Sequence, residues 1–97
     1  LADSTMQFAA APNPFNPQIT FYIDLPDRSE GGECSLSVYN LAGQLVRHWR
    51  MAAPVKGKYK ILWTGDSDAG MPAASGTYIA VLRAGTLIKS LRLTLLK

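Results

Sequence analysis

The clearest strand signal in the chain is Gly76–Leu96, GTYIAVLRAGTLIKSLRLTLL. It contains two runs of apolar and β-branched residues, Gly76–Arg83 and Leu87–Leu96, which are typical of strands. Ala84–Thr86 lies between them and contains the glycine that a tight turn favours. The stretch therefore predicts an antiparallel hairpin whose second strand directs alternate leucines into the core: Leu91, Leu93 and Leu95.

Upstream of this hairpin, shorter segments repeat the same period-two alternation. Ile19–Leu25, Cys34–Tyr39 and Tyr59–Trp63 each place an apolar residue at every second position, which is the pattern of a half-buried strand. A cysteine at such a position behaves as a small apolar residue, so Cys34 is expected to be buried. Asn40–Gly43 is expected to form a turn, with Gly43 in the left-handed conformation.

The segment Leu41–Ala53 is ambiguous. Leu41, Leu45 and Trp49 fall at helical spacing, but residues 45–49 also fit a strand with either face inward. Gly43 interrupts the helix, and a hairpin turn already accounts for the residues before it. We therefore favour a strand.

The remaining segments read as connections. Pro12–Pro17, PNPFNP, cannot form a helix because it contains three prolines, and its Phe15 is the expected anchor into the core. Thr64–Ser75 has the composition of an irregular loop. A loop at Gly31–Gly32 and a turn at Pro54–Gly57 separate other strands. Residues 1–11 are expected to be a linker or a first edge strand, ahead of a domain spanning 12–97.

Length and composition agree with one folded domain. The chain has 97 residues, of which 47% are hydrophobic and 18% charged, which excludes a disordered chain. No apolar run reaches the roughly 20 residues of a membrane helix. The sequence begins without a methionine or a signal peptide, so we expect a piece of a longer protein. The strands and turns predict an all-β chain, an antiparallel β-sandwich of about seven strands.

The net charge is +3, but it is unevenly distributed. Up to Val46 the only base is Arg28, whereas from Arg47 onward nine lysines and arginines face only Asp66 and Asp68. This excess could attract an anionic partner such as nucleic acid or lipopolysaccharide. The bases are spread over several strands at alternate positions, so a solvated sheet face is the stronger interpretation.

Catalysis and nucleic-acid binding are not expected. His48 lies between Arg47 and Arg50 on what should be an exposed strand face, without a plausible triad. One cysteine and one histidine cannot assemble a zinc site. The aromatic residues more readily fill a small core than form a platform for stacked bases. We therefore predict neither an enzyme nor a cofactor.

One possible metal site lies at Asp66 and Asp68, which precede a glycine as in the start of a calcium loop. No acidic residue follows Asp68 in the chain, so the bidentate ligand of such a loop is missing. Turn hydrogen bonds that the aspartates accept from backbone amides explain both residues better. No metal is expected.

Several motifs, taken in order, resemble a known bacterial family. They are NPFNP (13–17), an alternating strand ending at Leu25–Pro26, VYNLAGQLV (38–46), WTG (63–65) with DAG (68–70), ASGTY (74–78), and residues 89–97. Together they cover nearly all of residues 8–97. The chain resembles the type A C-terminal sorting domain of the type IX secretion system, which is similar to the immunoglobulin-like domain of flagellar hook-capping proteins.

The resemblance implies an immunoglobulin-like sandwich of seven strands and supports a strand at Leu45–Met51. It also implies a secreted or outer-membrane surface location, reached through the periplasm. The expected partners are the outer-membrane translocon, a sortase-like peptidase and an upstream cargo in the same chain. The resemblance implies that the C-terminal tail acts as an address for export. The residues that match the family motifs or lie in this tail are Asn13, Pro14, Phe15, Asn16, Pro17, Gly43, Trp63, Gly65, Gly76, Tyr78, Lys89, Leu95 and Lys97.

Two positions depart from the family pattern. Ala11 stands where an aromatic residue usually precedes the proline-rich segment, and Thr64 stands where an acid usually follows the tryptophan. The tail, Leu87–Lys97, is expected to end in an edge strand whose unpaired backbone a receptor could pair with. A retained structural or adhesion module, as in a hook cap, is the alternative function.

Overall fold

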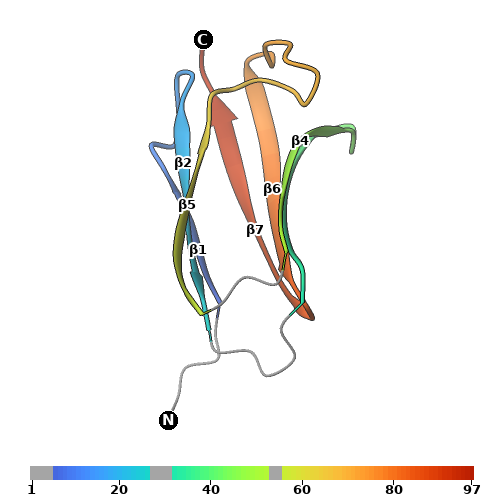
Figure 1. Cartoon of the computed structure of the whole chain (residues 1–97). Coiled ribbons are helices and arrows are strands. Elements are labelled where there is room, and N and C mark those ends of the chain that lie inside the picture. The colour runs from blue at the N-terminus through green and yellow to red at the C-terminus, as the bar shows by residue number, and fades with distance from the viewer. Residues whose placement is uncertain (1–5, 27–31, 53–55) are drawn as a thin grey trace.

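The computed structural model describes residues 6–26, 32–52 and 56–97, which form seven strands in two layers (Figure 1). The first sheet has the order β1-β2-β5 and the second β4-β3-β6-β7, and every neighbouring pair is antiparallel. The described residues contain no helix, so the predicted antiparallel sandwich is confirmed. The strands are β1 (Gln7–Ala11), β2 (Ile19–Leu25), β3 (Cys34–Asn40), β4 (Leu45–Met51), β5 (Gly57–Trp63), β6 (Gly76–Ala84) and β7 (Leu87–Leu95).

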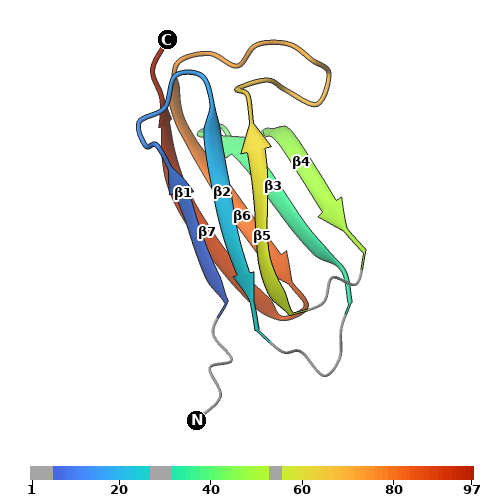
Figure 2. The ribbon, with the colours of Figure 1, turned by 60° about the vertical axis from the view of Figure 1, so that its left-hand side comes forward.

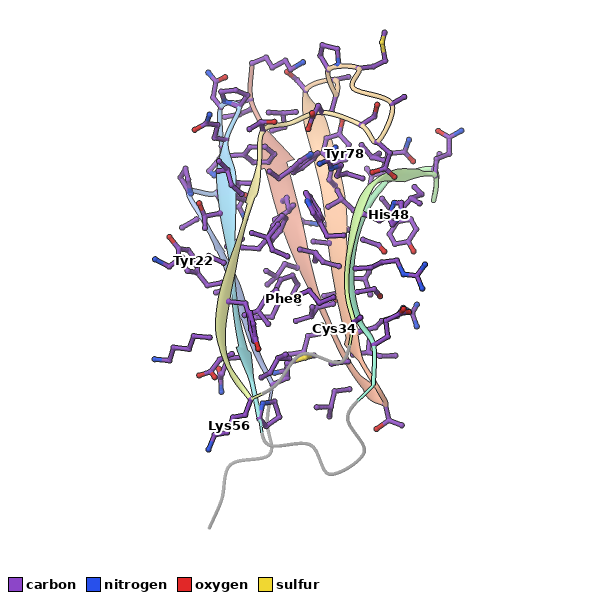
Figure 3. All side chains as sticks on the ribbon, in the orientation of Figure 1. Phe8, Tyr22, Cys34, His48, Lys56 and Tyr78 are labelled. Carbon is purple, nitrogen blue, oxygen red and sulfur yellow. The ribbon has the colours of Figure 1, made fainter. Side chains whose placement is uncertain are left out.

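The core lies between the two sheets and follows the alternation in the sequence. In β2, every second residue from Ile19 to Leu25 is buried, and β3 repeats the pattern from Cys34 to Val38. Such alternation places one face of each strand in the core and the other in solvent. Figure 3 shows Phe8 and Cys34 between the sheets, whereas Tyr22 projects from the outer face.

The hairpin predicted at Gly76–Leu96 is present. β6 and β7 pair along their whole length, from Gly76 opposite Leu95 to Ala84 opposite Leu87. Leu93 and Leu95 are fully buried, and Leu91 is half-buried against the core, as predicted. β6 is one residue longer and β7 one residue shorter than the sequence predicts.

The ambiguous segment forms strand β4, so the strand interpretation is confirmed. The Asn40 side chain accepts hydrogen bonds from the backbone amides of Ala42 and Gln44, both at 3.0 Å, and Gly43 has φ 82°. These contacts close the β3–β4 turn as an Asx-type turn with a left-handed glycine. Trp49 faces inward, and its ring centroid lies 6.0 Å from that of Phe21.

Residues 7–11 form an edge strand rather than a linker: β1 pairs with β2 from Gln7 opposite Asp24 to Ala11 opposite Thr20. The first five residues and parts of the predicted Gly31–Gly32 loop and Pro54–Gly57 turn lie outside the described residues. The described part of the chain contains no helix that is both long and apolar enough to cross a membrane.

Candidate functional site

Most of the residues singled out in the sequence meet at one end of the sandwich. The segment 12–18, the loop 64–75 and the last residues of β7 lie at the same end in both views, at the top of Figures 1 and 2. We call this the upper end. The fold thus brings four separate sequence motifs together: Asn13–Pro17, Trp63 with Gly65, Gly76 with Tyr78, and Leu95 with Lys97.

An aromatic cluster supports the upper end from inside. The ring centroid of Trp63 lies 5.4 Å from that of Phe15 and 5.7 Å from that of Tyr78, and all three side chains are buried. Trp63 Nε1 donates a hydrogen bond to the carbonyl oxygen of Asp66 at 2.7 Å. Both Phe15 and Trp63 are therefore core anchors, as the sequence predicted.

Tyr78 joins the same cluster to the start of β6. Burial raises the pKa of the Tyr78 phenol above its ordinary value of 10.0. Its hydroxyl therefore keeps its proton, and it donates a hydrogen bond to the carbonyl oxygen of Ala74 at 2.5 Å.

The proline-rich segment pairs with the outer edge of β7. Phe15 donates its amide to Thr94 O and accepts from the Leu96 amide, both at 2.9 Å. The Asn13 side chain donates to Arg92 O at 2.9 Å and accepts from the Thr94 amide at 3.0 Å.

The tail is consequently not the open edge that the sequence predicted. The outer-edge backbone groups from Arg92 O to Leu96 N are already bonded, because the proline-rich segment runs beside β7 on its way from β1 to β2. Only the first part of β7 can present unpaired groups. In this part, Lys89 lies on the same face of β7 as the buried Leu93 and Leu95, yet it is exposed. A charged residue on the inward face of an edge strand disfavours the pairing of another strand with that edge.

Gly65 allows the loop 64–75 to approach the proline-rich segment. A Cβ on Gly65 would lie 3.0 Å from the carbonyl oxygen of Pro17, and its φ of 76° is left-handed. The Gly65 carbonyl accepts from the Ala73 amide at 2.8 Å, which closes the base of the loop. Glycine is therefore favoured at position 65 for two reasons: the backbone is left-handed there, and Pro17 leaves little room for a side chain.

A groove lies where these two segments meet. The groove has a volume of about 390 Å³, and its lining residues include Asn16, Pro17, Gly65, Asp66 and Lys97. The Lys97 amide donates to Ser75 Oγ at 3.0 Å, so the backbone of this residue is fixed while its side chain stays exposed. We call this the upper groove.

Four of the predicted residues line the upper groove: Asn16, Pro17, Gly65 and Lys97. Gly43 and Lys89 belong to other parts of the fold. Gly43 sits in the β3–β4 turn, and Lys89 pairs with Leu82 in the half of β7 far from the upper end. Ala11 is the exposed last residue of β1, and Thr64 donates a hydrogen bond to Asp66 Oδ1 at 3.2 Å.

A cluster of charged residues fastens the loop 64–75 to the edge of β4. Asp68 Oδ1 accepts from the His48 amide at 3.0 Å, Asp68 Oδ2 lies 2.5 Å from His48 Nδ1, and the Asp68 amide donates to Val46 O at 2.8 Å. Arg47 lies 4.0 Å from Asp66 and 3.8 Å from Asp68, and it stacks over Trp49 at 5.1 Å.

This cluster corrects two sequence interpretations. His48 is exposed as predicted, but Arg47 is half-buried on the inward face beside Trp49. Asp68 forms hydrogen bonds with β4 rather than within its own turn. The hydrogen bonds within the turn are made by Ser67. Its carbonyl oxygen accepts one from the Gly70 amide at 2.9 Å, and its hydroxyl oxygen accepts one from the Met71 amide at 3.2 Å.

The contacts of Asp68 shift its titration. Burial alone would raise the pKa of Asp68. The hydrogen bonds from the His48 side chain and backbone, with the electrostatic interactions of Asp68 with His48 and Arg47, outweigh burial and hold the pKa below its ordinary value of 3.8. Asp68 therefore stays ionised as an anchor for the loop.

Comparison with known proteins identifies the family. The model of the FlgD Ig-like domain family matches residues 16–93. The chain belongs to the FlgD Ig-like domain family. This membership confirms the immunoglobulin-like part of the fold prediction. No curated protein sequence matches the chain.

Solved structures show the same FlgD Ig-like fold at low sequence identity. Dimeric latent PorU from Porphyromonas gingivalis superposes with a TM-score of 0.72 at 17% identity, covering 99% of this chain and 10% of PorU. PorZ of the same organism, described as a surface component of its type IX secretion system, gives 0.61 at 23% identity, covering 93% of this chain and 11% of PorZ. FlgD from P. aeruginosa gives 0.60 at 15% identity, covering 97% of this chain and 74% of that one.

The chain thus spans about a tenth of the PorU and PorZ chains. Sequence reasoning missed two features of this FlgD Ig-like domain: the bonds between Asn13 and β7, and the pairing of His48 with Asp68. No local pattern marks either contact, because the partners lie 79 to 81 and 20 residues apart in the chain.

Proposed function

We propose that this domain is a sorting address of the type IX secretion system. In this proposal the outer-membrane translocon binds the domain and carries an upstream cargo from the periplasm to the cell surface or the medium. A sortase-like peptidase then acts on the exported chain. The domain acts by being bound and contributes no catalytic residue or metal of its own.

The observation that carries the proposal is the upper groove. Phe15, Trp63, Gly65 and Tyr78 are explained by packing, since each is buried in or against the core. Asn16, Pro17 and Lys97 are exposed, and packing does not require their side chains. That these exposed motif residues line one groove supports a recognition role for the upper end.

The fold comparison supports the same system. PorZ is a surface component of type IX secretion and contains a domain of this fold. A sorting role also fits a surface or extracellular location, reached through the periplasm.

A retained assembly module is the second candidate function. It is favoured by the family itself, since the chain covers 74% of a FlgD chain with the same fold. In that case the domain would stay in place and bind neighbouring subunits without directing export.

The test is an export assay in a bacterium with a type IX system. Residues 1–97 are fused behind a signal peptide and a fluorescent cargo, and cargo is measured in the periplasm, at the surface and in the medium. Export of the cargo supports the sorting proposal. Cargo that stays in the periplasm, while an established sorting domain exports it in the same strain, overturns the proposal and favours the assembly module.

Point variants then locate the address. Removing residues 90–97 would delete the buried Leu93 and Leu95 and unfold the sandwich, so milder changes are needed. Lys97→Ala removes a side chain of the upper groove, and Lys89→Ala removes the same charge far from it. We expect Lys97→Ala to lower export more than Lys89→Ala, with unchanged melting temperatures. The opposite order would move the address to the first half of β7.

A further inference from the structure

A second hollow lies on the outer face of the first sheet, on β1, β2 and β5. It has a volume of about 490 Å³. Outward side chains of two neighbouring rows line it: Gln7, Asp24 and Lys58 in one, and Ala9, Tyr22 and Lys60 in the other. Phe8, Ile23 and Tyr59 lie between the rows and pack in or against the core, so this middle row forms the floor. The hollow is therefore a trough that runs across the strands.

Tyr22 forms the one aromatic wall of the trough. It is the only aromatic side chain among the large exposed apolar residues of the described chain, with 42% of its surface accessible. Its neighbour on β1 is Ala9, whose methyl group is too small to cover the ring. On the β5 side, the Lys60 ammonium group lies 5.7 Å from the ring centroid. Figure 3 shows Tyr22 projecting away from the core.

The charge on this face is mainly positive. Lys56, Lys58 and Lys60 follow one another at alternate positions along or just before β5, and all are exposed. Against these three lysines, Asp24 is the one acid on the outer face of the described part of this sheet. An anionic ligand is therefore favoured, and Asp24 and Gln7 remain as hydrogen-bonding groups.

We propose that this trough binds an acidic saccharide. A sugar ring can stack on the single Tyr22 ring, its hydroxyl groups can bond with Asp24 and Gln7, and its acidic group can pair with Lys60. The trough's volume falls within the range of small-molecule sites. Single-stranded nucleic acid would need a series of stacking rings, and an added peptide strand would run along β5 rather than across the strands.

The proposal is independent of the sorting role, since the trough lies on a different surface from the upper groove. Its test is a titration of the isotope-labelled domain with an acidic galacturonate tetramer, followed by amide chemical shifts. The neutral galactose tetramer and inorganic phosphate are run beside it. We expect saturable shifts confined to β1, β2 and β5 with the acidic sugar, weaker binding of the neutral sugar, and no saturation with phosphate.

Matched variants separate stacking from general charge. Tyr22→Ala and Lys60→Gln should each weaken binding about fivefold. Lys89→Gln removes the same charge from β7 and should leave the affinity unchanged. Thermal melts control for folding; because all three side chains are exposed, small changes in melting temperature are expected.

Three results would overturn the proposal: no saturable binding of the acidic tetramer, equal saturation by phosphate, or equal weakening by Lys60→Gln and Lys89→Gln. If Tyr22→Ala lowers the melting temperature, Lys60→Gln decides the outcome alone.

Discussion

Gly65 and Gly70 provide a matched pair that measures how tightly the loop 64–75 packs on the proline-rich segment. Both have left-handed φ values, 76° and 83°. A Cβ on Gly65 would lie 3.0 Å from Pro17 O, whereas one on Gly70 would meet nothing within 4 Å. Alanine at either position therefore adds the same conformational strain, but only Gly65→Ala adds a clash with backbone.

The expected costs follow from these two contributions. Forcing a non-glycine residue into the left-handed region costs about 1–2 kcal/mol, which is all we expect for Gly70→Ala. Overpacking against a backbone atom adds about 1–3 kcal/mol, so Gly65→Ala should cost about 2–5 kcal/mol. The predicted difference between the variants is therefore about 1–3 kcal/mol.

Urea unfolding followed by tryptophan fluorescence measures this difference, provided that the m-values agree. Trp63 lies two residues before Gly65 in the chain and reports on the upper end. If the two variants lose the same stability to within about 0.5 kcal/mol, the close approach at Pro17 is not part of the folded state.

Three further predictions concern other contacts of the upper end. Trp63→Ala should cost about 3–5 kcal/mol in urea unfolding, because the side chain is fully buried; a loss within about 0.5 kcal/mol would place it on the surface. Asn13→Ala removes two hydrogen bonds to β7 and should cost about 1–3 kcal/mol, whereas an equal loss in Asn16→Ala would show that those bonds are not specific. The folded-state pKa of Asp68 is lowered, so its carboxylate stabilises the fold above an unfolded-state pKa near 3.8, and this stability is lost as the pH falls. Asp68→Asn should therefore lower the melting temperature at pH 7 and flatten its decrease below about pH 5, and parallel curves for both proteins would contradict this.

The strands could be predicted from the sequence because their signal is local. In β2, β3 and β6 the alternation that buries every second residue is visible directly in the sequence. Gly43 was a correct basis for choosing a strand over a helix at Leu45–Met51, because a residue in the left-handed conformation of a turn interrupts a continuous helix.

The edges of the sheets could not be predicted in this way. The tail looks like an open edge strand, yet Asn13 and Phe15 occupy its second half from a segment about 80 residues away. The edge of β4 is covered by Asp68 in the same manner. Which segment covers an edge depends on how the two sheets pack, and no local spacing encodes that arrangement.

We propose that this domain is an export address and more than a copy of a common fold. The most direct measurement compares it with the immunoglobulin-like domain of FlgD from P. aeruginosa, which has the same fold at 15% identity. Each domain is fused behind the same signal peptide and fluorescent cargo in one type IX bacterium, and the exported fraction of cargo is measured. We expect export with this domain and periplasmic retention with the FlgD domain. Equal export of both, or retention of both, would contradict it.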